Sequence, residues 1–459
     1  MPGMASDQTI TLIGAGLAGT LLAILLSKRG CRVELYERRS DPRVRLGSAG
    51  RSINLALSTR GLHGLQQAGL VDLVRQRSIK MPGRIIHTLD GATRFQPYGV
   101  NPSEVLYAIS RAELQKLLLD ALTHHPNVQL VFDAKCVDVN TAKQTLTLSH
   151  ESTGEITTLM RQRIIGTDGS SSAVRSAMLR IPRFDYSQTH LEHGYKELTI
   201  PPAPDGSFQL EPHALHIWPR GTYMLIALPN LDGSFTCTLF MPFAGAVSFE
   251  ALSTPTTIIA FFQQQFPDAM PLMPHLVDDF TANPTGTLVT IKCAPWHDRD
   301  HLLLLGDAAH AIVPFFGQGM NCAFEDCTEL DACIEAAAPD WERVFATFFS
   351  RRKPNTDAIA DMAVDHYIEM RDRVADPHFQ LQKQIEQELA RRFPGHYTPS
   401  YALVTFQRIP YAQAREQARI HERILQQLSA DINDLEQVDW QQAERLIQRE
   451  LPLSREGAA

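Results

Sequence analysis

The run TITLIGAGLAGTLLAILLS (9–27) constrains the fold of this chain more than any other stretch. It contains a GxGxxG motif, GAGLAG (14–19), between a strand-like segment and a helix-like segment from about Leu17 to Ser27. A second strand-like segment, RVELYE (32–37), follows. Strand, glycine turn, helix and strand in this order predict a βαβ unit in a parallel, doubly wound sheet.

The three glycines of this motif predict a dinucleotide site. Gly14 permits the tight turn, Gly16 lets the backbone approach a pyrophosphate, and Gly19 lets the helix pack closely on the strand. The helix N-terminus at Leu17 offers free N–H groups to the phosphates. Glu37 ends the second strand, where a carboxylate accepts hydrogen bonds from ribose hydroxyls. We find no second fingerprint in the sequence, so we expect one permanently bound dinucleotide.

The pattern of apolar and turn residues in the remaining sequence predicts further regions. SRAELQKLLLDALTHHP (110–126) is helical, with Ser110 and Glu113 placed as a capping box. After about residue 180, short strands separated by turn residues predict a mostly antiparallel sheet. LLLLGDAAH (302–310) returns to the buried-strand style, and the chain is nearly all helical beyond about residue 340.

We therefore predict an α/β protein with a Rossmann-like cofactor domain, an inserted antiparallel β-sheet substrate domain and a C-terminal α-helical region. The cofactor domain is discontinuous, with residues 1–75, 100–180 and 285–370. The substrate domain takes residues 76–99 and 181–284. The helical region, 371–459, is expected to cover the substrate pocket.

Composition excludes several classes of protein. The net charge of −8 lacks the basic excess of nucleic-acid binders. Seven dispersed cysteines without a CxxC fit reduced thiols and not a disulfide framework or zinc site. The two HxxH patterns, at 190/193 and 213/216, lack the helical context of a metal site, so no metal is expected. No secretory signal is recognisable, and the glycines within 11–27 favour a buried strand–turn–helix over a membrane span.

Three motifs in order indicate a family. GAGLAG with Glu37, GTDGSSSAVR (166–175) and GDAAHAIVPFFGQGMNCAFED (306–326) resemble the single-component FAD-dependent aromatic hydroxylases, the p-hydroxybenzoate hydroxylase-like flavoprotein monooxygenases. In that family the GD segment and the following helix cradle the ribityl chain and the isoalloxazine ring. The DG segment, here Asp168-Gly169, serves FAD and transiently bound NADPH.

A physical reading of the third motif agrees with a flavin site. We expect Asp307 to be a buried carboxylate that bonds ribityl or ribose hydroxyls. Gly317 and Gly319 let backbone approach a flat ring, and the next helix presents its N-terminus near Met320 and Asn321, where a dipole stabilises a reduced flavin. His310 is interpreted as a satisfied core histidine.

The resemblance implies further flavin contacts. Arg38 and Ala56 match family contacts, and Arg111 matches a family arginine, although a helix-surface charge is the alternative for it. The full expected set for the cofactor is Gly14, Gly16, Leu17, Gly19, Glu37, Arg38, Ala56, Arg111, Asp168, Asp307, Gly319, Met320 and Asn321.

Segments outside the flavin motifs narrow the family. GRSINLALSTRG (50–61), MPGRIIH (81–87), QPYG (96–99), HGYKELTI (193–200), HALHIWPRGTYMLIALPN (213–230), YIEM (367–370) and YALVTF (401–406) resemble the kynurenine 3-monooxygenase family. The resemblance implies that Arg84 and Tyr98 bind the amino-acid carboxylate of kynurenine. An arginine fork suits both carboxylate oxygens, and a phenol adds a neutral donor. Tyr401 and Glu369 are expected in the same pocket.

Apolar residues are expected to wall that pocket and keep water from the reactive oxygen species. They are Ile226, Leu228, Phe240, Pro314, Phe315 and Phe316. Each of the six has plain core packing as its alternative. One position departs from the family pattern, because His366 stands where the family has a substrate-contacting asparagine. We expect substrate to bind still, with altered affinity or pH dependence, since a histidine is bulkier and can charge near neutral pH.

The resemblance implies the reaction. NADPH reduces tightly bound FAD, the reduced flavin forms a C4a-hydroperoxide with O₂, and its distal oxygen hydroxylates L-kynurenine at ring position 3. The flavin carries this chemistry, so no side chain is expected to be a catalytic acid or base. Open alternatives are a hydroxylase of another anthraniloyl or phenolic acid, a flavin reductase or oxidase that does not hydroxylate, and a flavin-loaded sensor.

The expected partners are small molecules only, with neither nucleic acid nor membrane. Eukaryotic relatives carry a C-terminal membrane anchor, whereas this chain ends in the polar LPLSREGAA (451–459), so a cytoplasmic, bacterial-type enzyme is expected. The oligomeric state stays open, with a homodimer as one option.

Overall fold

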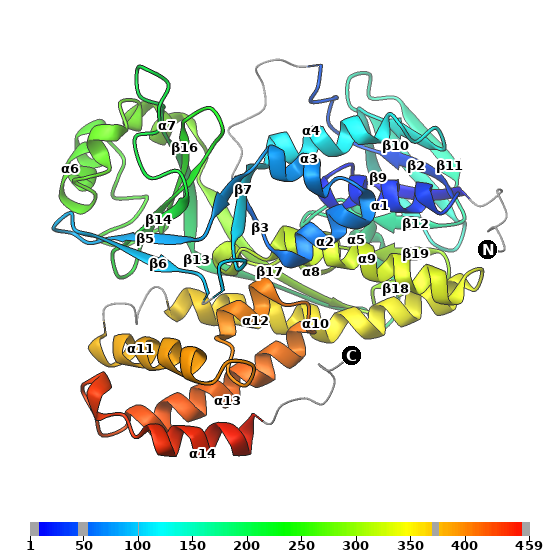
Figure 1. Cartoon of the computed structure of the whole chain (residues 1–459). Coiled ribbons are helices and arrows are strands. Elements are labelled where there is room, and N and C mark those ends of the chain that lie inside the picture. The colour runs from blue at the N-terminus through cyan, green and yellow to red at the C-terminus, as the bar shows by residue number, and fades with distance from the viewer. Residues whose placement is uncertain (1–8, 45–53, 100, 370–375, 452–459) are drawn as a thin grey trace. The chain divides into compact units, whose positions relative to one another are not determined.

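A computed structural model describes residues 9–44, 54–99, 101–369 and 376–451. The chain divides into two compact units. The first consists of residues 1–79, 107–191 and 287–363, and the second of residues 80–106, 192–286 and 364–459. The predicted α/β fold class, with a parallel cofactor sheet, a mostly antiparallel sheet and C-terminal helices, is confirmed (Figure 1).

The main sheet of the first unit has six strands and is mostly parallel. Its order is β18 (His297–Asp298), β19 (Leu302–Leu304), β12 (Ile164–Gly166), β1 (Thr9–Ile13), β2 (Arg32–Tyr36) and β8 (Val128–Val131). All neighbouring pairs are parallel except β18 with β19. The predicted βαβ unit is therefore β1, α1 (Leu17–Lys28) and β2.

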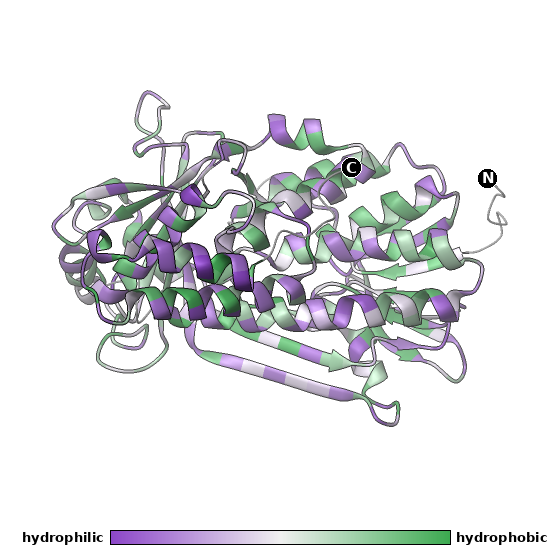
Figure 2. Ribbon diagram, turned by 60° about the horizontal axis from the view of Figure 1, so that its bottom comes forward, coloured by the Kyte–Doolittle hydropathy of each residue, from purple (hydrophilic) through white to green (hydrophobic). Residues whose placement is uncertain are grey.

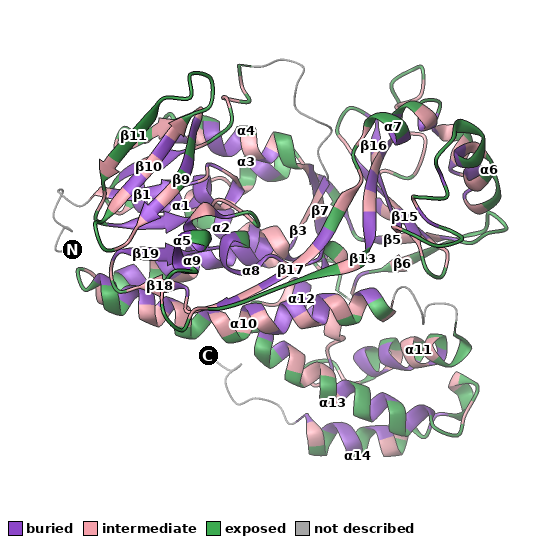
Figure 3. Ribbon diagram, turned by 180° about the vertical axis from the view of Figure 1, so that it is seen from behind, coloured by how far each residue is buried: buried purple, intermediate pink, exposed green. Residues whose placement is uncertain are grey.

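Helix α1 explains the long apolar run of the sequence. Ten of its residues, from Leu17 to Ser27, are buried, and it packs against β2, α4 (Arg111–Leu122) and α9 (Gly319–Ala337). Figure 3 shows the same burial along α1 and β1. The run is apolar because the helix is covered on several sides by protein. Among the described residues, no helix is long and apolar enough to cross a bilayer.

Smaller elements complete the first unit. Its helices also include α2 (Thr59–Ala68), α3 (Val71–Gln76), α5 (Ala173–Met178), α8 (Asp307–His310), η2 (Pro314–Phe316) and most of α10 (Trp341–Ile368). One three-stranded sheet has the order β11 (Ile156–Met160), β10 (Thr145–His150) and β9 (Ala134–Asn140). Another, with the order β3 (Asn54–Leu57), β7 (Leu106–Ser110) and β4 (Ile79–Met81), has residues 80, 81 and 106 in the second unit.

The second unit is built on a seven-stranded sheet. Its order is β17 (Gly286–Ala294), β13 (Asp185–Ile200), β16 (Phe235–Pro242), β15 (Met224–Pro229), β14 (Ala214–Pro219), β5 (Gly83–His87) and β6 (Thr93–Pro97). Strands β17 and β13 continue into the first unit. The pair β14–β5 is parallel, whereas β13–β16, β14–β15, β15–β16 and β5–β6 are antiparallel.

One face of this sheet forms a core with the helices inserted after β16. Those helices are α6 (Pro255–Gln265), η1 (Met270–Leu272) and α7 (Leu276–Ala282). Trp218, Leu225 and Leu239 point into this core with Phe262 and Phe266. Because strand side chains alternate, the residues between them face the other way.

The C-terminal helices pack on one another in a core of their own. They are α11 (Pro377–Arg392), α12 (Ser400–Phe406), α13 (Tyr411–Ser429), η4 (Leu435–Gln437) and α14 (Trp440–Glu450). Figure 2, in which these helices come forward, shows hydrophilic and hydrophobic residues interspersed along them, as expected of amphipathic helices.

All seven cysteines are buried and unpaired, which agrees with the prediction of reduced thiols. One of the two bonds of the capping box predicted for α4 is present, because the Ser110 side chain accepts a hydrogen bond from the backbone N–H of Glu113. Residues 50–53, Met370 and residues 452–459, which belong to motifs quoted above, lie outside the described residues.

Candidate functional site

The glycine turn after β1 is shaped for a ligand. Gly14 has φ of +100°, and a side chain there would put its Cβ 2.7 Å from the carbonyl oxygen of Thr167. A Cβ on Gly19 would overlap the carbonyl oxygen of Gly14. Gly16 differs, because a Cβ there would meet no protein atom within 4 Å. Protein packing explains two of the glycines, and the open space at Gly16 fits the close approach of a pyrophosphate.

The acid at the end of β2 is tied to that turn. Glu37 Oε2 accepts a hydrogen bond of 2.9 Å from the N–H of Ala15, and Oε1 accepts one of 3.0 Å from the N–H of Arg39. Each carboxylate oxygen keeps further lone pairs for a ribose hydroxyl. Arg38, beside Glu37, is exposed. Glu37 therefore holds the glycine turn as well as standing where a ribose would lie.

Asp168 lies in the GTDG turn after β12 and caps α5. Its Oδ2 accepts hydrogen bonds from the N–H groups of Ala173 (2.7 Å) and Val174 (3.3 Å). Its Oδ1 is buried without a protein partner. Burial raises the pKa of this carboxyl group. A buried oxygen without a partner is costly, so this atom fits a donor from a ligand.

The exposure of Asp307 differs from the prediction. Asp307 is the first residue of α8 and is exposed, whereas a buried carboxylate was expected. The residues around it are buried, and Gly306, with φ of +63°, turns the chain so that Asp307 alone faces outward. An exposed acid at the end of β19 remains accessible to a bound hydroxyl group.

Asn321 uses its side chain to join segments of the cofactor unit. Its Oδ1 accepts from the N–H of Ser58 (2.9 Å), and its Nδ2 donates to the carbonyls of Ala56 (2.9 Å) and Gly317 (2.8 Å). The side chain is fully buried. It therefore orders the β3–α2 turn, and only the backbone of this first turn of α9 is left for a flavin. Sequence reasoning did not foresee that role.

Four other expected cofactor residues lie at helix starts. Gly319 and Met320 begin α9 and are partly exposed. Arg111 begins α4 and is exposed. Leu17 begins α1 and is 7% exposed, so its backbone and not its side chain faces the glycine turn.

A buried charge cluster supports the GD turn. Asp326 Oδ2 accepts from the N–H of Gly306 (3.1 Å) and lies 2.6 Å from Nε2 of His310. Arg352 Nε donates to Asp326 Oδ1 at 2.7 Å. Although burial opposes ionisation, His310 and Arg352 hold the pKa of Asp326 below its usual value. His310 is thus a satisfied core histidine, as predicted.

Cys322, His310 and Asp326 have ligand atoms within 4.8 Å of one another. A guanidinium already occupies the position of a cation among them, since Arg352 Nη2 lies 3.3 Å from Cys322 Sγ. This arrangement is a support for the cofactor turn.

Taken together, the first unit fits FAD. It offers open space at Gly16, an unpartnered buried oxygen on Asp168, an exposed acid at Asp307 and the N-terminus of α9. Anionic phosphates suit the free N–H groups of α1, and a reduced flavin suits those of α9.

The second unit gathers the expected substrate residues. The rings of Tyr98 and Tyr401 stack, with centroids 5.6 Å apart and planes 18° from parallel. Tyr98 is 8% exposed, and its hydroxyl is buried without a hydrogen-bond partner. Burial raises the pKa of both phenols, so each stays protonated and can donate. The positive charge of Arg84 opposes that rise in pKa for both phenols.

Arg84 itself is held by the neighbouring strand. Its Nε donates to Gln96 Oε1 at 2.9 Å across the β5–β6 pair. This bond directs the guanidinium and leaves its two terminal nitrogens for a carboxylate.

His366 lies at the end of α10 near the same group. Its ring centroid is 6.3 Å from that of Tyr401. Burial and the charges of Arg84 and Lys383 lower the pKa of His366 to about 3. The expectation that His366 charges near neutral pH is therefore wrong, because burial, reinforced by the charges of Arg84 and Lys383, keeps the ring neutral.

Glu369 follows α10 directly and is partly buried. Lys383 Nζ lies 3.4 Å from Glu369 Oε1 and 3.2 Å from Glu386 Oε2. The Glu369 carboxylate thus faces the end of α10 and α11, with Lys383 as its cation.

The register of the sheet shows which apolar residues share a face with Arg84. Arg84 pairs with Leu215 and Ile86 with Ile217. Ile217 pairs in turn with Ile226, and Met224 with Phe240. Since facing partners in a sheet point to the same side, these side chains lie on the face opposite the inner core. Two of the predicted wall residues, Ile226 and Phe240, belong to it, and Leu228 shares it by its even spacing from Ile226.

Sequence reasoning missed Leu215, Ile217 and Met224 on this face. The alternation within HALHIWPR (213–220) was a usable signal, but only the pairing of β14 with β5 shows which alternate residues share a face with Arg84.

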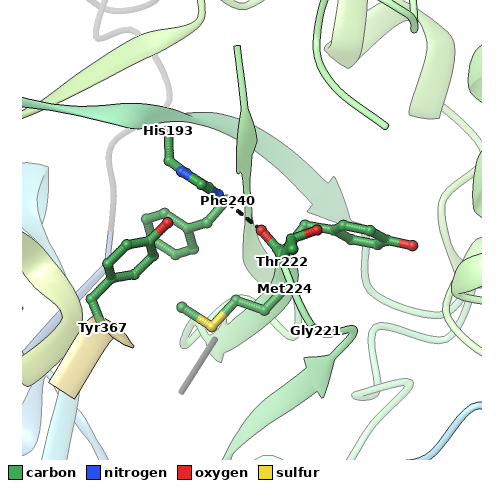
Figure 4. Close-up of a pocket in the computed structure, with 7 residues that line it drawn as sticks. His193, Gly221, Thr222, Met224, Phe240 and Tyr367 are labelled. Carbon is green, nitrogen blue, oxygen red and sulfur yellow. Dashed lines mark hydrogen bonds between the residues drawn. The ribbon is translucent and has the colours of Figure 1, made fainter. Parts of the chain in front are cut away.

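A small pocket opens at the far end of this face (Figure 4). It is lined by His193, Gly221, Thr222, Tyr223, Met224, Phe240 and Tyr367. His193 Nε2 donates to the carbonyl of Thr222 at 2.9 Å, and its ring meets that of Tyr367 edge-on at 5.3 Å. Phe240 therefore lines the pocket, although it is only 5% exposed. The other expected wall residues lie in η2 of the first unit, where Pro314 is exposed, Phe315 partly buried and Phe316 buried.

Comparisons with known proteins agree with these features. A family model described as an FAD binding domain matches residues 7–207 and 284–361. The kynurenine 3-monooxygenase of Myxococcus xanthus (strain DK1622) is 49% identical over 455 residues, which cover 99% of this chain and 98% of that protein. The kynurenine 3-monooxygenase of Stenotrophomonas maltophilia (strain K279a) is 45% identical, with 98% of each chain covered.

Solved structures share the fold. A tetrameric form of 2-methyl-3-hydroxypyridine-5-carboxylic acid oxygenase has a TM-score of 0.65 at 22% identity, covering 81% of this chain and 94% of that one. PqsL, a probable FAD-dependent monooxygenase from Pseudomonas aeruginosa, has a TM-score of 0.62 at 21% identity, covering 80% and 98%.

The fold and the dinucleotide turn define an FAD-dependent monooxygenase of the flavin hydroxylase class. Identity of 45–49% over nearly the whole length is far more specific than the shared fold. The chain belongs to the kynurenine 3-monooxygenase family.

Proposed function

We propose that this protein hydroxylates L-kynurenine at ring position 3 with FAD, NADPH and O₂. The observation that carries the proposal is the buried, unpartnered hydroxyl of Tyr98, on whose phenol the positive charge of Arg84 acts, because a neutral donor together with a guanidinium suits a carboxylate. Relatives named for this activity share 45–49% of the sequence.

The carboxylate end of the substrate would lie at Arg84, Tyr98 and Tyr401. The guanidinium offers two parallel N–H donors and the phenol of Tyr98 a third. Tyr401 stacks on Tyr98 and so fixes the direction of its hydroxyl. His366, neutral at physiological pH, and Glu369 would face the α-amino group of an amino-acid substrate.

The aryl end would lie along the apolar face. Leu228 pairs with Thr236, in the same row of the sheet as Leu215 and Arg84. Phe240 lies four residues further along β16, about 13 Å away by strand geometry. The row of the sheet between Leu228 and Phe240 contains Ile217 and Ile226, whose apolar side chains suit an aromatic ring.

Bound FAD, reduced by NADPH and reacted with O₂, would supply the oxygen atom. The residues of this chain would bind the substrate, orient it and exclude water. The aryl amine of kynurenine already makes the adjacent ring carbon electron-rich, so no strong base is required from the protein. Asp168 and Asp307 would bind the cofactor, as would the helix starts at Leu17 and Gly319.

The test measures L-kynurenine-stimulated NADPH oxidation together with 3-hydroxykynurenine and H₂O₂. We expect L-kynurenine to stimulate NADPH oxidation. Most of the NADPH molecules consumed should each yield one molecule of 3-hydroxykynurenine. Stimulation that yields H₂O₂ alone would make kynurenine an effector of a flavin oxidase. Absence of stimulation, with NADPH oxidation triggered by another anthraniloyl or phenolic acid, would overturn the substrate assignment.

A further inference from the structure

A chain of buried hydrogen bonds lies on the face of β5 opposite Arg84. His87 Nδ1 is 2.7 Å from Asp268 Oδ2, and His87 Nε2 is 2.8 Å from His216 Nδ1. His216 Nε2 is 2.9 Å from the carbonyl oxygen of Glu211. The two histidines are 3% and 2% exposed. None of these groups belongs to the site described above.

The hydrogen bonds determine how many protons the two rings carry. The Glu211 carbonyl can only accept, so His216 Nε2 must hold a proton. The Asp268 carboxylate, when ionised, can only accept, so His87 Nδ1 must hold another. The bond between the rings needs one proton more. Four ring nitrogens thus share three protons, whereas two neutral imidazoles have only two.

The surroundings place the third proton on His87. Burial lowers the pKa of His216 to about 4, which keeps that ring neutral. Burial opposes ionisation of Asp268, but hydrogen bonds from His87 and Trp218 lower its pKa. Trp218 Nε1 donates to both carboxylate oxygens, at 3.0 and 2.9 Å. The indole also stacks on His87 at 4.0 Å between ring centroids and 21° between planes, a geometry that favours a cation.

We propose that His87 is an imidazolium, protonated on both ring nitrogens, and that it acts as a positioning residue for Arg84. The part of this proposal that concerns substrate rests on the proposed function. Along β5, Arg84 and Ile86 point to the apolar face, whereas His87 points to the core side. The neighbouring β6 is mostly exposed, so β5 is anchored to the interior chiefly from β14 and from behind.

The imidazolium supplies that anchor. It joins β5 to β14 through His216 and to the turn after α6 through Asp268. Arg220 adds backbone ties, since its Nη1 donates to the carbonyl of His87 at 3.0 Å and its Nε to that of Gln265 at 2.6 Å. The charged or titratable groups that face His87 are Asp268, His216 and Arg220. Loss of the third proton would break one bond of the chain and loosen the strand that presents Arg84.

The first test is nitrogen NMR of the FAD-loaded protein with ¹⁵N-labelled histidine and arginine, assigned with His87→Gln and Arg84→Lys. We expect both ring nitrogens of His87 to show imidazolium shifts at pH 7 and His216 to show the neutral form protonated at Nε2. Neutral patterns for both rings would overturn the proposal. This readout needs no substrate, so it stands apart from a failure of the proposed function.

The second test compares His216→Gln with His216→Leu. A glutamine offers an oxygen to His87 and an N–H to the Glu211 carbonyl, so it can preserve the chain, whereas leucine cannot. His213→Gln, at an exposed position just before β14, is the control for the loss of a histidine. FAD content and circular dichroism check that each variant folds.

We expect His216→Leu to weaken L-kynurenine binding about tenfold, the effect of one lost positioning bond, and to shift the Arg84 Nε–H resonance. His216→Gln and His213→Gln should stay within about twofold of the parent. Equal losses in the glutamine and leucine variants would show that His216 has only a packing role and would overturn the positioning of Arg84. If the parent itself does not bind kynurenine, the Arg84 resonance decides between the same two outcomes.

Discussion

The rings of Tyr98 and Tyr401 stack at 5.6 Å although one belongs to the β6 end and the other to a C-terminal helix. The stack closes one side of Tyr98 and leaves its hydroxyl buried without a hydrogen bond. Burial of a hydroxyl without a partner costs about 1–3 kcal/mol, and the carboxylate of a substrate bound at Arg84 would complete this one. Under the proposed function, substrate binding and not stability explains the Tyr98 hydroxyl.

Replacing Tyr98 with phenylalanine tests that relationship. We expect the Kd for L-kynurenine to rise about 5- to 30-fold, the effect of one hydrogen bond to a charged group. The free energy of unfolding should stay equal or increase, because the hydroxyl has no partner to lose. Substrate titration and thermal unfolding measure the two effects.

Tyr397→Phe is the matched control. Its hydroxyl is also buried without a partner, but it lies in the core of the C-terminal helices. Kynurenine affinity should not change in this variant. Equal losses of affinity in both variants would contradict a direct role for Tyr98.

Arg84 should dominate substrate affinity. We expect Arg84→Met to weaken kynurenine binding at least about 100-fold, since it removes a charged, two-pronged partner worth roughly 3 kcal/mol. Arg84→Lys should recover only part of this, because an ammonium cannot present the planar fork. Arg94→Met, an exposed arginine on β6 beside β5, serves as the control. If the Arg84→Lys variant bound kynurenine as tightly as the parent, the positive charge alone would matter at this position.

The sequence predicted local structure well because it depends on neighbours in the chain. Helix α1 begins at Leu17 as expected, and β2 (Arg32–Tyr36) lies within the predicted strand 32–37. Exposure was less predictable, since Asp307 lies in an apolar stretch yet faces outward through the turn at Gly306. The low pKa of His366 comes first from burial and then from the charges of Arg84 and Lys383, which lie far away in the sequence. Such properties follow from tertiary contacts that no local pattern contains.

His366 gives a pH prediction with a definite sign. Its pKa is about 3 in the folded chain, against about 6.5 for an unfolded one. The unfolded state therefore binds a proton below pH 6.5 that the folded state does not bind until about pH 3. The contribution of His366 to the free energy of unfolding is therefore fully present above pH 6.5. It is lost as the pH falls, by about 2 kcal/mol at pH 5.

His366→Asn removes this effect. We expect the free energy of unfolding of the parent to fall more between pH 7.5 and 5 than that of the variant. Kynurenine binding by the two proteins should keep parallel pH profiles over this range, since the imidazole of the chain is already neutral throughout it. His190→Asn, at an exposed position, controls for the loss of a histidine. A binding profile that differs between parent and variant near pH 6.5 would show that His366 titrates in the folded protein.

Gly16 and Gly19 separate cofactor binding from folding. At Gly16 a methyl group would meet no protein atom within 4 Å, and φ is −69°, so Gly16→Ala should fold normally. Its methyl group would instead stand where we place the pyrophosphate, so FAD content after purification should fall at least about tenfold.

At Gly19 a methyl group would collide with the carbonyl of Gly14, a rigid backbone atom. Gly19→Ala should therefore lose both FAD and the folded state, by several kcal/mol of overpacking. Circular dichroism with flavin absorbance distinguishes the two variants, and an FAD-loaded Gly16→Ala protein would place the pyrophosphate elsewhere.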